Sequence, residues 1–218
     1  GHNYLLDGSR AGNGVTTGDY LEFVEGGTEA HSSSVGGYDI KINNAATRAT
    51  HSGTVGLTKG VIDAGEQITV SEGGRTVNFK TEKGKSVEQT LNDLESAIND
   101  AGLKIDLMRE FPPATSSGAP QAITLRHKEF GSEHTFQAAS NTAGLVSSVS
   151  NIPETIANGT DVSGEINGEE ASGRGQILTG DPGADTVEGI KIRYTGETTP
   201  PGGNAGTVTF SQNSLTFQ

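Results

Sequence analysis

Glycine is the residue that most constrains this chain. It occupies 32 of 218 positions, about twice the usual share. Because glycine is costly inside helices and strands but adopts turn conformations freely, the chain should contain many turns and little helix. Apolar residues make up only 31% of the sequence, so the core is lean. We therefore expect a mainly β fold with a minor α+β part, in one large domain or two small ones.

The charge and the missing residue types exclude several functions. The net charge is −12 and lysine and arginine form no cluster, which argues against nucleic acid as a partner. No apolar run reaches the roughly 20 residues that cross a bilayer, so we expect no membrane partner either. Without cysteine the chain can form no disulfide, thiolate metal site or cysteine nucleophile.

The two ends of the chain carry short strand-like segments separated by turns. Near the start, residues 20–24 are rich in strand-forming types and residues 38–42 alternate apolar with polar side chains. The glycine-rich residues 10–14 predict a turn, and 43–51 an extended segment. Near the end, short strands are expected at 164–167, 176–178, 190–194 and 207–210, with a turn at 180–183. Residues 200–203 (PPGG) should separate the last two strands as the loop of a long hairpin.

The middle of the chain has a different pattern. Strands at 67–70 and 76–80 flank Gly73-Gly74, which predicts a hairpin. A helix follows: Ser86 and Gln89 have the capping-box spacing, and Gly102 should end it. Its apolar face is formed by Val87, Leu91, Leu94 and Ile98. Further strands are expected at 103–107, 122–126 and 135–138, with a proline-rich loop at 112–120. The order is ββαββ, with a possible last strand, and the helix should cover one face of a sheet.

These patterns predict a domain inserted into another. Residues 1–52 and 151–218 share a composition and should form one discontinuous β-rich proximal domain. Residues 53–150 should form an inserted α+β (ββαββ) distal domain. The two ends of the chain are then expected to lie side by side.

One group of side chains could in principle bind a metal ion. His127, Glu129, Glu133 and His134 combine imidazole with carboxylate, as zinc sites do. Their spacing matches no helix-borne pair of ligands, and Gly131 places them in a loop. Solvated charges of a hairpin loop are the simpler interpretation, and we expect no metal site.

Other chemical motifs are weaker still. Asp181, Asp185 and Glu188 surround a glycine-rich turn but lack the twelve-residue calcium-loop pattern. Residues 173–175 (GRG) lack the third glycine of a dinucleotide fingerprint and are interpreted as the entry to a strand. Asn158 begins a glycosylation sequon, which matters only in a host with that machinery. We expect no catalytic residue, no cofactor and no enzyme activity.

Several segments, in this order, resemble bacterial flagellin. Tyr4–Ser9 (YLLDGS) resembles the turn where the first core helix region of a flagellin gives way to its variable domains. Ser214–Gln218 (SLTFQ) resembles the strand that leads back into that core. Residues 61–140 are similar to the short hook-IN-like repeat of flagellins and hook-associated proteins, with Ala97-Ile98-Asn99 at its helix end. The segments 37–49, 164–180 and 188–196 also resemble parts shared by flagellins and flagellar cap proteins.

The resemblance implies a structural and non-catalytic role. A flagellin's middle domains would form the surface-exposed, antigenic part of a filament subunit, outside the cell, with other flagellin subunits as partners. The helical polymerisation arms of a flagellin do not occur in these 218 residues, so we expect this chain alone to be monomeric in dilute solution.

Two alternatives stay open. The chain could form the middle domains of a flagellar cap or hook-associated protein, with a role in tip assembly or adhesion. It could also be an extracellular module that binds or hydrolyses carbohydrate, since a chain with 27 acidic residues always offers carboxylate pairs.

Overall fold

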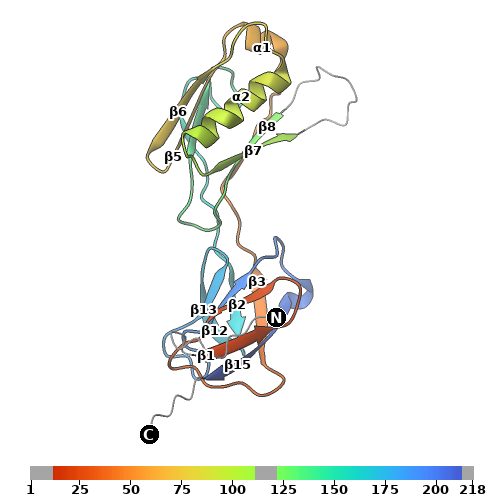
Figure 1. The fold of residues 1–218 in the computed structure, drawn as a ribbon, viewed down its shortest axis with the longest axis vertical. Coiled ribbons are helices and arrows are strands. Elements are labelled where there is room, and N and C mark those ends of the chain that lie inside the picture. Colours follow the sequence, from red (N-terminus) through yellow and green to blue (C-terminus); the bar gives the residue numbers. More distant parts are fainter. Residues whose placement is uncertain (1–11, 111–121, 213–218) are drawn as a thin grey trace. The chain divides into compact units, whose positions relative to one another are not determined.

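The computed structural model describes residues 12–110 and 122–212, which form two compact units (Figure 1). Unit 1 lies within Gly1–Thr47 and Thr160–Gln218, and unit 2 lies within Arg48–Gly159. The boundaries between the units therefore fall at 47/48 and 159/160, whereas composition suggests 52/53 and 150/151.

Unit 1 is built on one antiparallel sheet of eight strands. In sheet order the strands are β1 (Gly12–Thr16), β15 (Asn204–Gln212), β3 (Tyr38–Asn44), β11 (Ser163–Ile166), β12 (Glu169–Arg174), β13 (Ile177–Gly180), β14 (Lys191–Tyr194) and β2 (Leu21–Glu25). A short 3-10 turn, η1 (Pro201–Gly203), precedes β15. Strands from both ends of the chain thus share one sheet.

The sheet curls until its two outer strands, β1 and β2, lie close together. The Thr16 hydroxyl donates to the Leu21 carbonyl at 2.9 Å. A Cβ on Gly14 would lie 2.3 Å from the Phe23 ring, so only glycine fits where β1 passes over that ring. Phe23 in turn packs on Phe210 of β15, with ring centroids 6.2 Å apart. The sheet is therefore a nearly closed barrel.

The inner face of this barrel holds the core of unit 1. In β3 the side chains of Tyr38, Ile40 and Ile42 are buried, while Asp39 and Lys41 are exposed. This is the alternation expected of a strand with one face to the core and one to water. Leu21, Ile166, Leu178, Ile192, Tyr194, Val208 and Phe210 complete the core from the other strands.

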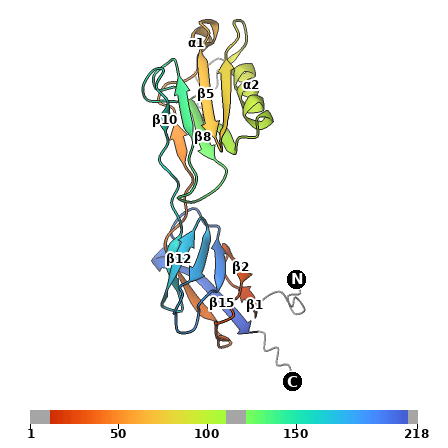
Figure 2. The ribbon, with the colours of Figure 1, turned by 90° about the vertical axis from the view of Figure 1, so that its left-hand side faces the viewer.

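Unit 2 contains two small antiparallel sheets and two helices (Figures 1 and 2). The first sheet consists of β10 (Glu154–Thr155), β9 (Gln137–Ser140), β5 (Gln67–Glu72) and β6 (Arg75–Lys80). The second consists of β4 (Thr50–Ser52), β8 (Ala122–His127) and β7 (Ile105–Glu110). The two helices are α1 (Lys59–Asp63) and α2 (Val87–Asp100).

Helix α2 has the boundaries that its sequence specifies. The Ser86 side chain accepts from the Gln89 backbone N–H, and the Gln89 side chain accepts from the Ser86 backbone N–H, both at 3.0 Å. This capping box satisfies two N–H groups that the first turn leaves unpaired. At the other end, Gly102 has φ +76°, the left-handed conformation that commonly terminates a helix.

The apolar face of α2 packs on both sheets. Leu91 and Leu94 are fully buried and Ile98 almost so. The helix contacts β6 of the first sheet and β7 of the second. Buried residues from all these elements form one core cluster, which includes Ile62, Ile68, Val70, Ile105, Ile123, Leu125 and Phe136.

The fold class expected from the sequence is confirmed: the protein is mainly β with a minor α+β part. The ββαββ order also occurs in unit 2, although its strands divide between two sheets and helix α1 was not expected. Helix α1 has only five residues after its N-cap Thr58. This is too short for a helical spacing of apolar residues to be visible in the sequence.

Two expectations for unit 1 are wrong. Residues 12–14 belong to strand β1 and not to a turn, because β15 supplies a hydrogen-bonding partner that outweighs the glycines' preference. Residues 200–203 do not close a hairpin, since β14 pairs with β13 and β2, whereas β15 pairs with β1 and β3. The segments Tyr4–Ser9 and Ser214–Gln218 lie outside the described residues, so their expected proximity stays a prediction; of the described ends, Gly12 pairs with Gln212.

Candidate functional site

The candidate metal-binding group is found at the end of β8 and in the loop that follows it. His127 is the last residue of β8 and only 1% exposed. Its Nε2 lies 3.1 Å from a carboxylate oxygen of Glu72, and its Nδ1 accepts the Glu129 backbone N–H at 2.9 Å. Both ring nitrogens are therefore used by the protein itself.

Of the other members of the group, Glu129 contacts both His134 and Lys104. The Nε2 of His134 lies 3.2 Å from one Glu129 carboxylate oxygen, and the Lys104 amine lies 3.0 Å from the other. The hydrogen bond from Lys104, together with the positive charge of that amine, lowers the pKa of Glu129 below the usual glutamate value. The rings of His127 and His134 stack at 5.0 Å between centroids.

The result is an ion-pair network and not a set of converging ligands. Across residues 12–110 and 122–212, no three or more histidine, aspartate or glutamate side chains are arranged to hold a metal ion. Sequence reasoning identified His127 and Glu129 but missed Glu72, which is 55 positions away from His127 and carries no local signal.

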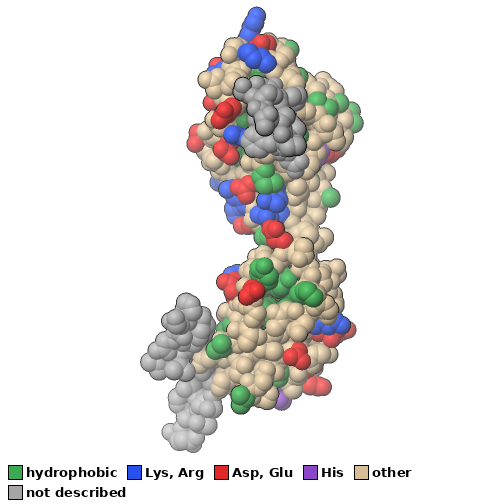
Figure 3. All heavy atoms as spheres, turned by 90° about the vertical axis from the view of Figure 1, so that its right-hand side faces the viewer, with side chains coloured by type: hydrophobic (Ala, Val, Ile, Leu, Met, Phe, Trp, Pro, Cys, Tyr) green, Lys and Arg blue, Asp and Glu red, His purple; other side chains and the backbone are tan. Residues whose placement is uncertain are grey.

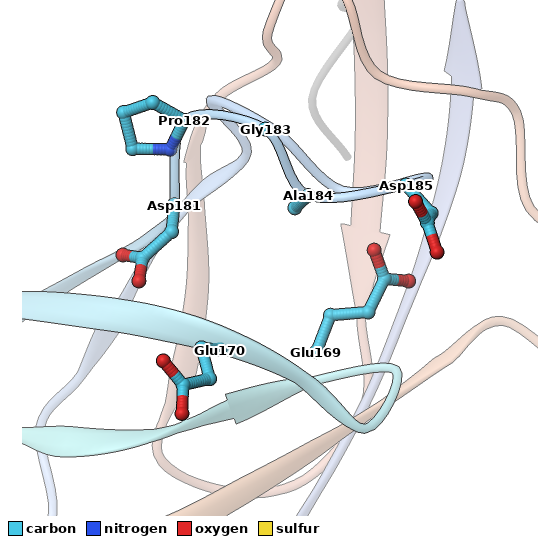
Figure 4. Close-up of a pocket in the computed structure, with 7 residues that line it drawn as sticks. All are labelled: Glu169, Glu170, Asp181, Pro182, Gly183, Ala184 and Asp185. Carbon is cyan, nitrogen blue, oxygen red and sulfur yellow. The ribbon is translucent and has the colours of Figure 1, made fainter.

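The acidic turn that contains Asp181 and Asp185 forms part of the rim of an open hollow of about 320 Å³ in unit 1 (Figure 4). Asp181 and Glu170 lie on one side of it and Asp185 and Glu169 on the other. Asp181 accepts from the Ser172 hydroxyl and Glu188 from the Gly183 N–H. The hollow is lined by Glu169, Glu170, Asp181, Pro182, Gly183, Ala184 and Asp185.

Glu169, the first residue of β12, accepts several hydrogen bonds beside this turn. It accepts the Thr186 N–H at 2.8 Å, the Thr186 hydroxyl, and the Asn167 amide at 3.0 Å. Burial by itself raises the pKa of Glu169, but these hydrogen bonds and one from the Val187 backbone outweigh it and lower the pKa below the usual value. The side chain therefore acts as an anionic brace that ties the turn at Thr186 to β12.

Residues 173–175 have a structural explanation. Gly173 and Arg174 end β12, so this segment is the exit of one strand and the turn into β13, not a simple strand entry. A Cβ on Gly173 would lie 1.6 Å from the Val162 carbonyl oxygen. Glycine is required because another backbone segment passes directly beside it.

The sequon lies at the joint between the two units. Asn158 is exposed, and its side-chain amide donates to the Ser132 carbonyl at 2.8 Å.

Neither α1 nor α2, the α-helices among the described residues, is long and apolar enough to span a bilayer. Figure 3 shows acidic and basic side chains interspersed on the surface it displays, with hydrophobic side chains in small groups.

Comparison with known proteins gives a match at the level of the fold. No protein-family model and no curated protein matches the sequence. The structure resembles the D2-D3 domains of the flagellar cap protein FliD from Escherichia coli, with TM-score 0.58 and 16% identity over 93% of this chain and 100% of that chain.

Two further structures agree. The E. coli FliD D1-D2-D3 structure matches with TM-score 0.58 and 16% identity, over 94% of this chain and 58% of that one. FliD (HAP2) from Pseudomonas aeruginosa PAO1 matches with TM-score 0.50 and 13% identity, over 88% and 84%. At these identities the likeness shows a shared fold, which is that of the middle domains of flagellar cap proteins.

Proposed function

We propose that this chain supplies the middle, non-catalytic domains of a flagellar cap or hook-associated protein. The observation that carries the proposal is the extent of the structural match. It covers 93% of this chain, and therefore parts of both units, and 100% of the E. coli D2-D3 chain.

The preference between the two flagellar candidates differs from the one that the sequence suggested. The resemblance of Tyr4–Ser9 and Ser214–Gln218 to flagellin placed a filament subunit first, but those segments lie outside the described residues. The reported structural neighbours are cap proteins. They favour a role at the filament tip, with the flagellin middle domain as the second candidate.

The rest of the assignment follows from this role. The protein would act outside the cell, at the flagellum, with other flagellar subunits as partners and without a cofactor, nucleic acid or membrane. The division into a discontinuous proximal domain and an inserted distal domain belongs to the same proposal. We expect the 218-residue chain to sediment as a monomer, and a stable dimer at micromolar concentration would contradict this.

Electron microscopy of intact flagella tests the proposal. Antibodies raised against the chain, with gold-conjugated secondary antibodies, are applied to the cells that produce it. Labelling confined to filament tips is the expected result. Labelling along the whole filament would instead establish the flagellin role, and absence of label from flagella of cells shown to make the protein would exclude both.

The carbohydrate module remains a third candidate with a separate test. A glycan array and a hydrolase screen with the purified chain should be negative. Reproducible binding or turnover that is lost on replacing Glu170 and Asp181, the acids on one side of the hollow, would overturn a purely structural role.

A further inference from the structure

A loop of unit 2, residues 128–135, contacts the segment that begins at Arg48, by which the chain enters that unit. The Arg48 guanidinium lies over the Phe130 ring, 4.6 Å from its centroid. Such a cation–π contact contributes modestly at a partly exposed site. Next to it, the Ala49 carbonyl accepts the His127 backbone N–H at 2.8 Å, a bond that continues the pairing of β4 with β8 up to the start of the loop.

The same loop holds the segment by which the chain leaves unit 2. The Asn158 side-chain amide donates to the Ser132 carbonyl at 2.8 Å. The Gly159 N–H donates to the His134 carbonyl at 3.3 Å. Entry and exit segments thus both contact one loop, in addition to the strand pairings of β4 with β8 and β10 with β9.

The loop is itself fixed by His127 in one protonation state. Since Nδ1 accepts the Glu129 N–H, it carries no proton, so the ring is neutral with its proton on Nε2. That N–H donates to Glu72 of β5. The other Glu72 oxygen accepts the Lys104 backbone N–H at 2.7 Å, so Glu72 joins the first sheet to the second.

The charges around this ring come from three elements. β5 contributes Glu72, and the segment before β7 contributes Lys104. The loop contributes Glu129 and His134, whose ring is stacked 5.0 Å from that of His127. The Glu129 carboxylate is already shared between the Lys104 amine and His134, so it has little capacity to compensate a further positive charge.

We propose that His127 and His134 form a pH-sensitive clip in unit 2. At neutral pH the clip fixes loop 128–135, and acid loosens this loop together with its contacts to Arg48, Asn158 and Gly159. A proton added to the His127 Nδ1 would face the Glu129 N–H, so that hydrogen bond must break. The new imidazolium would be almost fully buried, with the His134 ring centroid 5.0 Å from its own.

The Glu72 carboxylate opposes this release in part, because it would attract the imidazolium. It is 11% exposed and already bonded to Lys104, so it cannot follow the ring if the loop moves outward. The expected change is therefore local to the loop and its two anchored segments, while α2 and the sheets stay folded.

Amide hydrogen exchange of the 218-residue chain, followed by NMR between pH 7.5 and 5.5, tests the proposal. After correction for intrinsic rates, protection of the Glu129 and Gly159 amides should fall about tenfold in acid, as the loss of one hydrogen bond predicts. Amides of Leu91 and Leu94 in α2 should keep theirs. The imidazole nitrogen shifts of the unmodified chain should show His127 neutral and protonated on Nε2 at pH 7.5.

Three variants isolate the groups. His127→Gln retains a donor and an acceptor but does not titrate, so the loop amides should lose their pH response. His51→Gln is the matched control within unit 2, since His51 pairs with Glu154 at 3.3 Å outside the clip, and the response should persist. His31→Gln in unit 1 should also leave it unchanged.

Three results would overturn the proposal, and none requires a variant to fold. The first is a His127 ring with its proton on Nδ1 at neutral pH. The second is unchanged protection of the Glu129 and Gly159 amides across the pH range. The third is an equal loss of protection in α2, which would mean that acid unfolds the whole unit and that no local clip exists.

Discussion

The two units differ in how far apart in the sequence their paired strands lie. Unit 1 joins the far ends of the described chain: β1 pairs with β15, and Gly12 lies opposite Gln212. Unit 2 is continuous, and its central elements are neighbours, as in the β5–β6 hairpin where Glu72 lies opposite Arg75. Both units use glycine where the chain turns, and in unit 1 glycines such as Gly164, Gly173 and Gly180 also lie where another backbone segment passes close by.

Because of this difference, different substitutions should destabilise each unit. A barrel whose strands are distant in sequence depends on close backbone contacts that no local preference supports. A unit built around a capped amphipathic helix depends on how that helix is buried. A single substitution should therefore lower the free energy of unfolding of one unit and leave that of the other unchanged.

The largest effect is expected from Gly173→Ala in unit 1. The added Cβ would lie 1.6 Å from the Val162 carbonyl oxygen, so the barrel backbone must shift. We expect a loss of more than about 4 kcal/mol in the free energy of unfolding of unit 1, in the range of severe backbone strain. Calorimetry should show the unit 1 transition lost or strongly lowered and the unit 2 transition kept.

Gly36→Ala is the matched control, because its nearest neighbour would be the Ser34 hydroxyl at 3.7 Å. It should leave both transitions in place. If Gly173→Ala lowers both transitions together, the two units unfold as one and the comparison fails.

Leu94→Ala should produce the next largest effect, this time in unit 2. The side chain is fully buried between α2 and the sheets, so its truncation leaves a cavity. The expected cost is about 2–5 kcal/mol. Denaturant unfolding monitored by NMR signals of each unit measures it, and the exposed Ser96→Ala on the same helix should change little.

Ser86→Ala should weaken unit 2 less. It removes the hydroxyl that caps α2, at an expected cost of about 1 kcal/mol. Ser86→Asp keeps an acceptor at this position and should restore most of the stability. Equal midpoints for Ser86→Ala and the unmodified chain would show that burial alone holds the helix.

The smallest effect is a pH dependence confined to unit 1. Because hydrogen bonds lower the folded-state pKa of Glu169, its contribution is present above the unfolded glutamate pKa of about 4.3 and is lost as pH falls through the lower folded value. Thermal unfolding between pH 6 and 3 should show a decline in the unit 1 midpoint that is smaller in Glu169→Gln. The same slope in both chains would refute the role of Glu169.

The candidate sites illustrate how far sequence reasoning reached. It found His127, Glu129 and His134, and the structure places these three together. It could not supply Glu72, which reaches His127 only because the two sheets of unit 2 pack on each other. The result is a network of ion pairs whose partners depend on packing and not on spacing.

Elements with local signals could be predicted from the residues alone. The capping residues and apolar spacing define α2, the paired glycines define the β5–β6 hairpin, and alternation defines β3. Each of these depends on residues within one helix turn or one strand of each other, so the preference is visible without a partner.

The pairing of strands, by contrast, depends on contacts between segments that are far apart in the sequence. The sequence could not show that β1 is a strand, that β14 and β15 are not neighbours, or that 50–52 pair with β8 and so belong to unit 2. The reason is physical: a backbone hydrogen bond between strands is nearly independent of side-chain identity, so its partner is chosen by the closure of the barrel and the packing of the core.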